Sequence, residues 1–115
     1  ISPNQHVTTQ SIESIERGTI PTIEAAQPAD GTMLYVETPL SMTATATDKE
    51  GNPVEYQLWL DGQRLVDWGA ALSSVWTPAR DDDGLHRVEV RVRDGFGGFA
   101  SKLVEIFVLL RLVAP

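Results

Sequence analysis

Few side chains in this sequence are of the kinds that catalyse reactions. The two histidines are His6, within a polar amino-terminal stretch, and His86, at the start of a valine-rich run. No serine has a Gly-x-Ser-x-Gly setting, and the sequence has neither a glycine-rich phosphate loop nor two histidines at the spacing of a helical metal site. The chain has no cysteine, which excludes cysteine nucleophiles and thiolate metal ligands. We interpret His86 as a half-buried strand histidine and predict that the domain is not an enzyme.

Acidic side chains provide a more informative set. In the segment DKEGN, acids and an amide occupy alternate positions, and a second segment, DGFGG, begins with another aspartate. Calcium takes roughly six to eight oxygen ligands, and loops with acids at alternate positions commonly supply them. The candidate calcium ligands are Asp48, Glu50, Asn52 and Asp94. The alternative is that Asp48 and Asp94 each close a turn by accepting hydrogen bonds from nearby backbone amides.

A third acidic segment, RDDDG, contains three consecutive carboxylates, Asp81–Asp83. Neighbouring side chains diverge, so they rarely reach one ion. We interpret this segment as a solvated turn.

The elements that position these side chains are predicted to be strands. From Pro21 onward, short runs of alternating apolar and polar residues are separated by Gly, Pro, Asn and Asp, which is typical of an all-β domain. In LSMTATAT, for example, Met42 and Ala44 fall on one face and Thr43 and Thr45 on the other. The predicted strands lie within TIEAA, TMLYVE, LSMTATAT, VEYQLWL, QRLVDW, ALSSVWTP, LHRVEVRVR and FASKLVEIFVLL.

These strands, without helices of consequence, predict an immunoglobulin-like Greek-key β-sandwich of seven to eight strands. In such a sandwich the DKEGN and DGFGG loops emerge at the same end, so the candidate calcium ligands can converge there. We place the sandwich at residues 21–111, a linker or approach segment at 1–20 and a carboxy-terminal linker at 112–115. Within the first segment, TQSIESIERG has the pattern of one or two helical turns that end at Gly18.

The segment YQLWLDGQRL predicts a large side chain that points away from the core. If Tyr56, Leu58 and Leu60 face inward, Trp59 faces outward. The strand of Trp59 should neighbour LHRVEVRVR, with the final strand on the other side. By the same alternation Leu85, Arg87 and Phe107 face outward, and pairing through the DGFGG hairpin sets Phe107 near Leu85 and Arg87. The candidate partner-binding patch consists of Trp59, Leu85, Arg87 and Phe107.

The patch has several interpretations. Exposed Trp and Arg are enriched where proteins bind other proteins, which favours a neighbouring protein as the partner. Sugar-binding modules also use flat aromatic surfaces, so a polysaccharide stays an alternative. A local alternative is a cation–π contact of Arg87 with Trp59, and another is that the amino-terminal segment covers the face.

The two other tryptophans have simpler interpretations. Trp76 shares a face with Leu72 and Ser74, so we predict that it anchors the core. Trp68 lies near a predicted edge strand, where buried and exposed positions are equally expected.

Three segments, ATATDKEGNPVEYQLWLDG, WTPARDDDGLHRVEVRVRD and the following GFGG, carry a resemblance to a known superfamily. Their order and spacing resemble the bacterial immunoglobulin-like, cadherin-like and PKD-like modules of secreted and surface proteins. The resemblance covers about 70 residues. The tight GDG turn and the Asp-Pro-Asp motif of PKD domains are missing, and Leu58 stands where relatives often have a core tryptophan. Three segments, PADGTML, LWLDGQRL and WTPARDDDGLHRVEVRVRDGFG, are also similar to a small carboxy-terminal domain of some bifunctional penicillin-binding proteins.

The resemblance implies a non-catalytic structural, adhesion or protein-interaction module from a larger bacterial protein that is secreted, periplasmic or on the cell surface. The alternative is a carbohydrate-binding or accessory domain of a cell-wall or extracellular enzyme. The formal charge of −7 disfavours nucleic acid and anionic membranes as partners. The carboxy-terminal apolar run contains Glu105 and Arg111 and is too short to span a bilayer, so we predict no membrane insertion.

Overall fold

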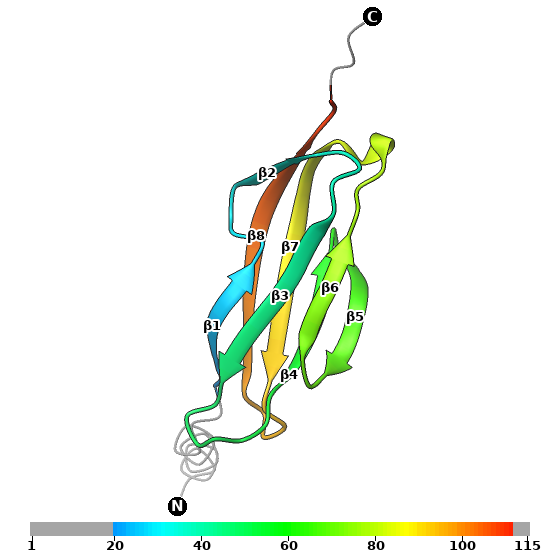
Figure 1. Ribbon diagram of the computed structural model, residues 1–115. Helices are drawn as coiled ribbons and strands as arrows, with labels where there is room; N and C mark the ends of the chain where they lie inside the picture. The colour runs from blue at the N-terminus through cyan, green and yellow to red at the C-terminus, as the bar shows by residue number, and fades with distance from the viewer. Residues whose placement is uncertain (1–19, 112–115) are drawn as a thin grey trace, which may run out of the picture.

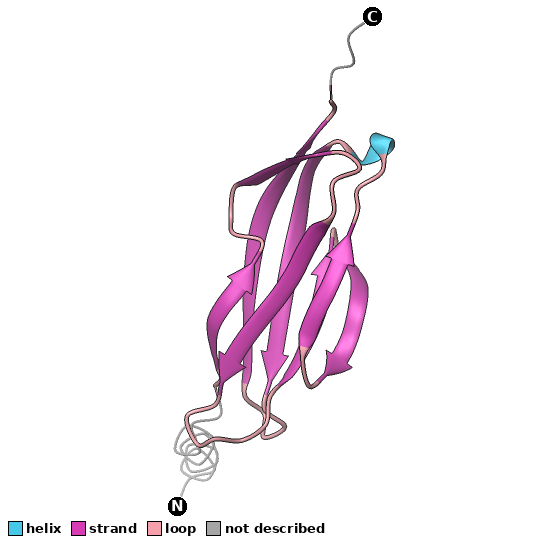
Figure 2. Cartoon of the chain, viewed as in Figure 1, coloured by secondary structure: helices cyan, strands magenta, loops and turns pink. Residues whose placement is uncertain are grey.

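The computed structural model describes residues 20–111, which form two β-sheets that pack face to face (Figures 1 and 2). The sandwich architecture predicted from the alternating pattern is therefore confirmed. The one helical element among the described residues is a single 3-10 turn. The elements are β1 (Thr22–Gln27), β2 (Thr32–Tyr35), β3 (Leu40–Thr47), β4 (Glu55–Leu60), β5 (Gln63–Gly69), β6 (Leu72–Trp76), η1 (Arg80–Asp82), β7 (Gly84–Arg93) and β8 (Phe99–Leu109).

The smaller sheet has the strand order β1-β3-β6, and the larger one has the order β2-β8-β7-β4-β5. The chain changes sheets between β1 and β2, so these two strands do not form a hairpin. Strand β2 instead runs parallel to β8, with Met33 opposite Phe107, and the other pairs are antiparallel. The five-stranded sheet places β7 between β4 and β8, as predicted for the strand that carries Trp59.

The core lies between the two sheets and follows the two-residue period of the strands. Met42, Leu58, Val92 and Ile106 are fully enclosed, each with a relative exposure of 0%. Their strands alternate these side chains with polar or exposed ones, which is why one face of each sheet is sealed and the other is open. Trp76 packs against the edge of this core, consistent with the predicted anchoring role.

The two ends of the sandwich carry different loops (Figure 1). Glu55, at the start of β4, lies opposite Arg93, at the end of β7. This register brings the β3–β4 and β7–β8 loops to the same end, as expected. The β1 strand begins at that end, whereas β8 finishes at the opposite end, where η1 also lies.

The predicted linkers fall mostly outside the described residues. Of the segment 1–20 only Ile20 is described, and the helical turns expected to end at Gly18 and the segment 112–115 are not. No helix within residues 20–111 has the length and apolar character needed to cross a membrane.

Candidate interaction face

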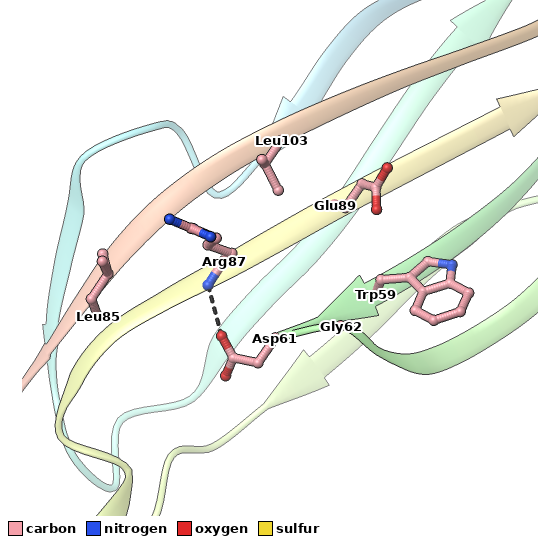
Figure 3. Close-up of a pocket in the computed structure, with 7 residues that line it drawn as sticks. All are labelled: Trp59, Asp61, Gly62, Leu85, Arg87, Glu89 and Leu103. Carbon is pink, nitrogen blue, oxygen red and sulfur yellow. Dashed lines mark hydrogen bonds between the residues drawn. The ribbon is translucent and has the colours of Figure 1, made fainter.

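The side of the five-stranded sheet that points away from the core is called the outer face below. On it Leu85 lies directly opposite Phe107, and Arg87 lies opposite Glu105, as the alternation predicted. A shallow pocket of about 560 Å³ lies on this face (Figure 3). Its lining consists of Trp59, Asp61, Gly62, Leu85, Arg87, Glu89 and Leu103.

The structure thus brings together three members of the predicted patch, namely Trp59, Leu85 and Arg87, in one pocket. Phe107 is beside Leu85 but is not among the lining residues. Leu103 was missed, although the alternation that places Phe107 outward also places Leu103 outward. Within the pocket the Oδ1 atom of Asp61 accepts a hydrogen bond of 2.9 Å from the backbone N–H of Arg87, which fixes the hairpin tip against β7 (Figure 3).

Trp59 is held in place through Gln57 on its own strand and Asp67 on the adjoining strand β5. Its Nε1–H donates a 2.7 Å hydrogen bond to Oε1 of Gln57, whose Nε2–H donates to Oδ1 of Asp67 at 3.0 Å. Gln57, the middle member of this relay, is only 4% exposed, whereas the side chain of Asp67 is 64% exposed. The backbone amide of Trp68 and then the Gln57 amide lower the pKa of Asp67, which keeps its carboxylate an acceptor. The ring orientation of Trp59 is therefore preorganised.

The alternative in which Arg87 stacks on Trp59 is not what the structure shows. The guanidinium of Arg91 lies 4.4 Å from the Trp59 ring centroid. Arg87 instead directs Nε to Oε2 of Glu105, its direct cross-strand neighbour, at 3.3 Å. Glu105 lies directly opposite Arg87 on β8, whereas Trp59 lies diagonal to it on β4. The guanidinium of Arg87 therefore pairs with the Glu105 carboxylate rather than with the Trp59 ring.

A second aromatic group lies on the outer face, near the β7–β8 loop. The guanidinium of Arg93 lies 4.2 Å from the Trp68 ring centroid, and Phe99 meets that ring edge-on at 6.5 Å. The guanidinium of Arg111 makes a third such contact, 4.4 Å from the Tyr35 ring centroid. Residues 20–111 therefore have three cation–π contacts beside the same sheet. About one is expected in a domain of this size. Trp68 is partly buried on edge strand β5.

Large apolar side chains cover the part of the outer face formed by β2, β7 and β8. They are more than one third exposed, and cross-strand pairing places Met33 beside Phe107 and Tyr35 beside Leu109. We call this group the apolar stripe. It consists of Met33 (64% exposed), Leu103 (59%), Leu85 (49%), Tyr35 (43%), Phe107 (40%) and Leu109 (37%).

The four candidate calcium ligands lie in or beside two loops at the same end of the sandwich. Oδ2 of Asp48 accepts hydrogen bonds from the backbone N–H of Glu50 and from Asn52, and Oδ1 of Asp94 accepts from the N–H groups of Phe96 and Gly98. These aspartates close their own loops, as in the alternative interpretation. Within residues 20–111, no three or more His, Asp or Glu side chains are grouped to hold a metal ion. The two loops lie at the same end of the sandwich, and Asp48 and Asp94 each accept hydrogen bonds from backbone amides of their own loop.

His86 joins three elements at the opposite end. Its Nδ1 lies 2.5 Å from Oδ2 of Asp61 in the β4–β5 turn, and its Nε2 lies 2.5 Å from the carbonyl oxygen of Asp82 in η1. Burial lowers the pKa of His86, but the hydrogen bonds to Asp61 and Asp82 and the charges of the two carboxylates outweigh it and raise the pKa above 6.5. Both ring nitrogens face acceptors, so the geometry fits the imidazolium form, which donates from both.

The fold and the open sheet face define an immunoglobulin-like sandwich module, a class that is generally non-catalytic. The model of the bacterial Ig domain family matches residues 21–90. This match covers more than half of the chain, which therefore belongs to that family. None of the curated protein sequences matches.

Solved structures show the same fold. The fibronectin(III)-like modules of CbhA from Clostridium thermocellum are similar with a TM-score of 0.63 and 24% identity over 80% of this chain, which spans 48% of that one. A CARDB domain from Pyrococcus furiosus is similar at 0.61, with 13% identity over 81% of this chain and 99% of that one. SGBP-B from Bacteroides ovatus, solved with a mixed-linkage heptasaccharide, is similar at 0.56, with 18% identity over 80% of this chain and 24% of that one.

Proposed function

We propose that this bacterial Ig-like domain is a non-catalytic extracellular module that separates and joins other parts of a larger secreted, periplasmic or surface protein. Its outer face would contact a neighbouring domain or another surface protein. The path of the chain carries this proposal: β1 begins at one end of the sandwich and β8 finishes at the other (Figure 1). The eleven residues of β8 extend over about 35 Å. The points at which the chain enters and leaves the domain are therefore separated by about that length.

The same path suits a module that carries load. A force applied at residues 20 and 111 acts along the strands and draws β2 and β8, which run in parallel, past each other. The β2–β8 contact extends from the hydrogen bond of Gly31 N–H to the Glu105 carbonyl, 2.8 Å, to that of Val36 N–H to the Leu109 carbonyl, 2.9 Å. Hydrogen bonds loaded in shear must break together rather than one by one.

Single-molecule stretching of the full chain tests this proposal. The chain has no cysteine, so handles can be attached through Ile20→Cys and Arg111→Cys. A matched control carries Lys49→Cys and Phe96→Cys in the two loops at one end, from which strands can be peeled apart in sequence. We expect one all-or-none unfolding event at a clearly higher force in the first geometry than in the control. Equal forces, or gradual extension between residues 20 and 111, would contradict the load-bearing role.

A carbohydrate-binding role is the second candidate, and the composition of the pocket favours it. Trp59 stands beside Asp61, Arg87 and Glu89, which combine an aromatic surface with hydrogen-bonding groups. Such a combination is typical of small-ligand sites. SGBP-B, with a similar fold, was solved with a bound heptasaccharide, a property of that protein.

Pull-down on insoluble bacterial and plant glycans tests the second candidate. If it is correct, the chain is retained by at least one glycan and Trp59→Ala abolishes the retention, whereas Val75→Ala on the other sheet does not. A chain that is retained by no glycan, or equally well after Trp59→Ala, would exclude this use of the pocket.

A further inference from the structure

The outer face differs in charge from the rest of the described chain. Five cations, namely Arg64, Arg87, Arg91, Arg93 and Arg111, and five acids, namely Glu55, Asp61, Asp67, Glu89 and Glu105, lie on or at the edge of this face. The face is therefore formally neutral. The remaining described residues have three cations and nine acids, a formal charge of −6. Nearly all the net charge of the chain, −7, thus lies off the outer face.

The arginines of the outer face are also paired locally. Arg91 contacts Glu89 at 3.1 Å, Arg93 contacts Glu55 at 2.9 Å, and Arg64 lies 3.8 Å from Asp67. With the contact of Arg87 to Glu105, no large single-sign field is left on this face. Two copies of an acidic molecule repel each other through most of their surfaces, and the repulsion is weakest where the charges cancel.

The area of the face lies at the lower end of the range for a stable interface. Strands β7 and β8 have ten and eleven residues and are about 35 Å long, whereas β2, β4 and β5 have four, six and seven residues. With strands about 4.8 Å apart, these lengths give a face of about 600 Å². Stable protein interfaces bury about 600 to 1,000 Å² on each partner.

We propose that the outer face binds the same face of a second copy of this chain, in a symmetric dimer related by a two-fold axis through the apolar stripe. This proposal rests on the proposed role of the outer face as a contact surface and names the partner. In an isologous interface each stripe covers the other, so Leu85, Leu103 and Phe107 leave water on both copies. The pairs of Arg64, Arg91 and Arg93 with their acids then lie beside the stripe, and the Arg87–Glu105 pair lies between Leu103 and the Leu85–Phe107 pair.

The proposed contact between the two outer faces resembles the packing of two sheets within one domain. Sheets that pack face to face lie about 10 Å apart with their side chains interdigitated. The exposed side chains of the stripe are large and project from three adjacent strands, as such packing requires. The outer side of the three-stranded sheet offers mainly short hydroxyl side chains, such as Ser41, Thr43 and Ser73, and lacks a comparable stripe.

Sedimentation velocity of the full chain over a wide concentration range tests the proposal. We expect a monomer–dimer equilibrium that Leu103→Arg weakens at least tenfold, because the substitution replaces an exposed apolar side chain of the stripe by a charged one. Met33→Arg on β2 should act in the same way. Val75→Arg is the matched control, since Val75 is 63% exposed on the outer side of the other sheet. It should leave the equilibrium unchanged, and circular dichroism verifies that each variant is folded.

A chain that stays monomeric at every concentration would overturn this proposal. So would a dimer that Val75→Arg abolishes and Leu103→Arg does not. Retention on a glycan by a chain that shows no self-association would identify a different occupant and also overturn it. The stretching experiment involves no second copy of the chain, so it tests the load-bearing role independently of the dimer.

Discussion

At the scale of single residues, His86 has the most consequential surroundings. Asp61, Asp82 and Trp76 face its ring from the β4–β5 turn, η1 and β6, with the Trp76 ring edge-on at 5.2 Å. Because the side chain of His86 is 13% exposed, little water is available to replace these acceptors. The charged imidazole is thus the form that this site stabilises.

This arrangement makes stability depend on pH in a defined direction. The folded pKa of His86 is raised above the ordinary histidine value of 6.5, so its contribution to stability is complete below pH 6.5 and decreases as pH rises through the folded pKa. We expect the free energy of unfolding, measured by urea titration, to fall across this window. His86→Gln should flatten the pH dependence there. A slope that is unchanged in the variant would show that another group is responsible.

At the scale of elements, the β4–β5 hairpin joins the outer-face pocket to the core. Its turn residues Asp61 and Gly62 both have positive φ, 51° and 78°, a conformation that tight hairpin turns favour at Asp-Gly. Asp61 lines the pocket and holds His86, so the conformation of the turn fixes the site. A hairpin with another turn would displace both side chains.

Two glycines at opposite ends of β5 provide a matched test of this conformation. A Cβ on Gly62 would meet no atom within 4 Å, so Gly62→Ala introduces backbone strain without a clash and should destabilise the domain by about 1 kcal/mol. Gly69 lacks positive φ, and a Cβ there meets only backbone oxygens at 3.8 and 4.0 Å. Gly69→Ala should therefore be neutral or slightly stabilising. Equal loss of stability in urea titrations of both variants would contradict this explanation.

At the scale of the whole molecule, the two proposed roles would use different directions of the sandwich. Load would pass lengthwise between its two ends (Figure 1), and contact with a partner would use the broad outer face that carries the pocket (Figure 3). The two directions are perpendicular, so a dimer formed through the outer face would leave both ends available for other parts of the protein. Such dimers would link two load-bearing chains side by side.

The sequence alone predicted much of this organisation because alternation is local. The two-residue period of LSMTATAT, YQLWL and LHRVEVRV was sufficient to place Met42, Leu58 and Val90 in the core. Adding the antiparallel hairpin at DGFGG placed Leu85 beside Phe107, as observed. The same alternation, followed four residues further along β8, would have found Leu103.

Only the tertiary structure decided which partners meet across longer separations. The parallel β2–β8 pair joins residues more than 70 positions apart, and no local pattern specifies it. The choice of Arg91 over Arg87 as the neighbour of Trp59 depends on which guanidinium already has a carboxylate across the ladder. The acids at Asp48 and Asp94 share one end of the fold, yet backbone amides within their own loops engage them first. Side-chain direction along a strand is set by the chain itself, whereas competition among several partners is resolved only when distant strands come together.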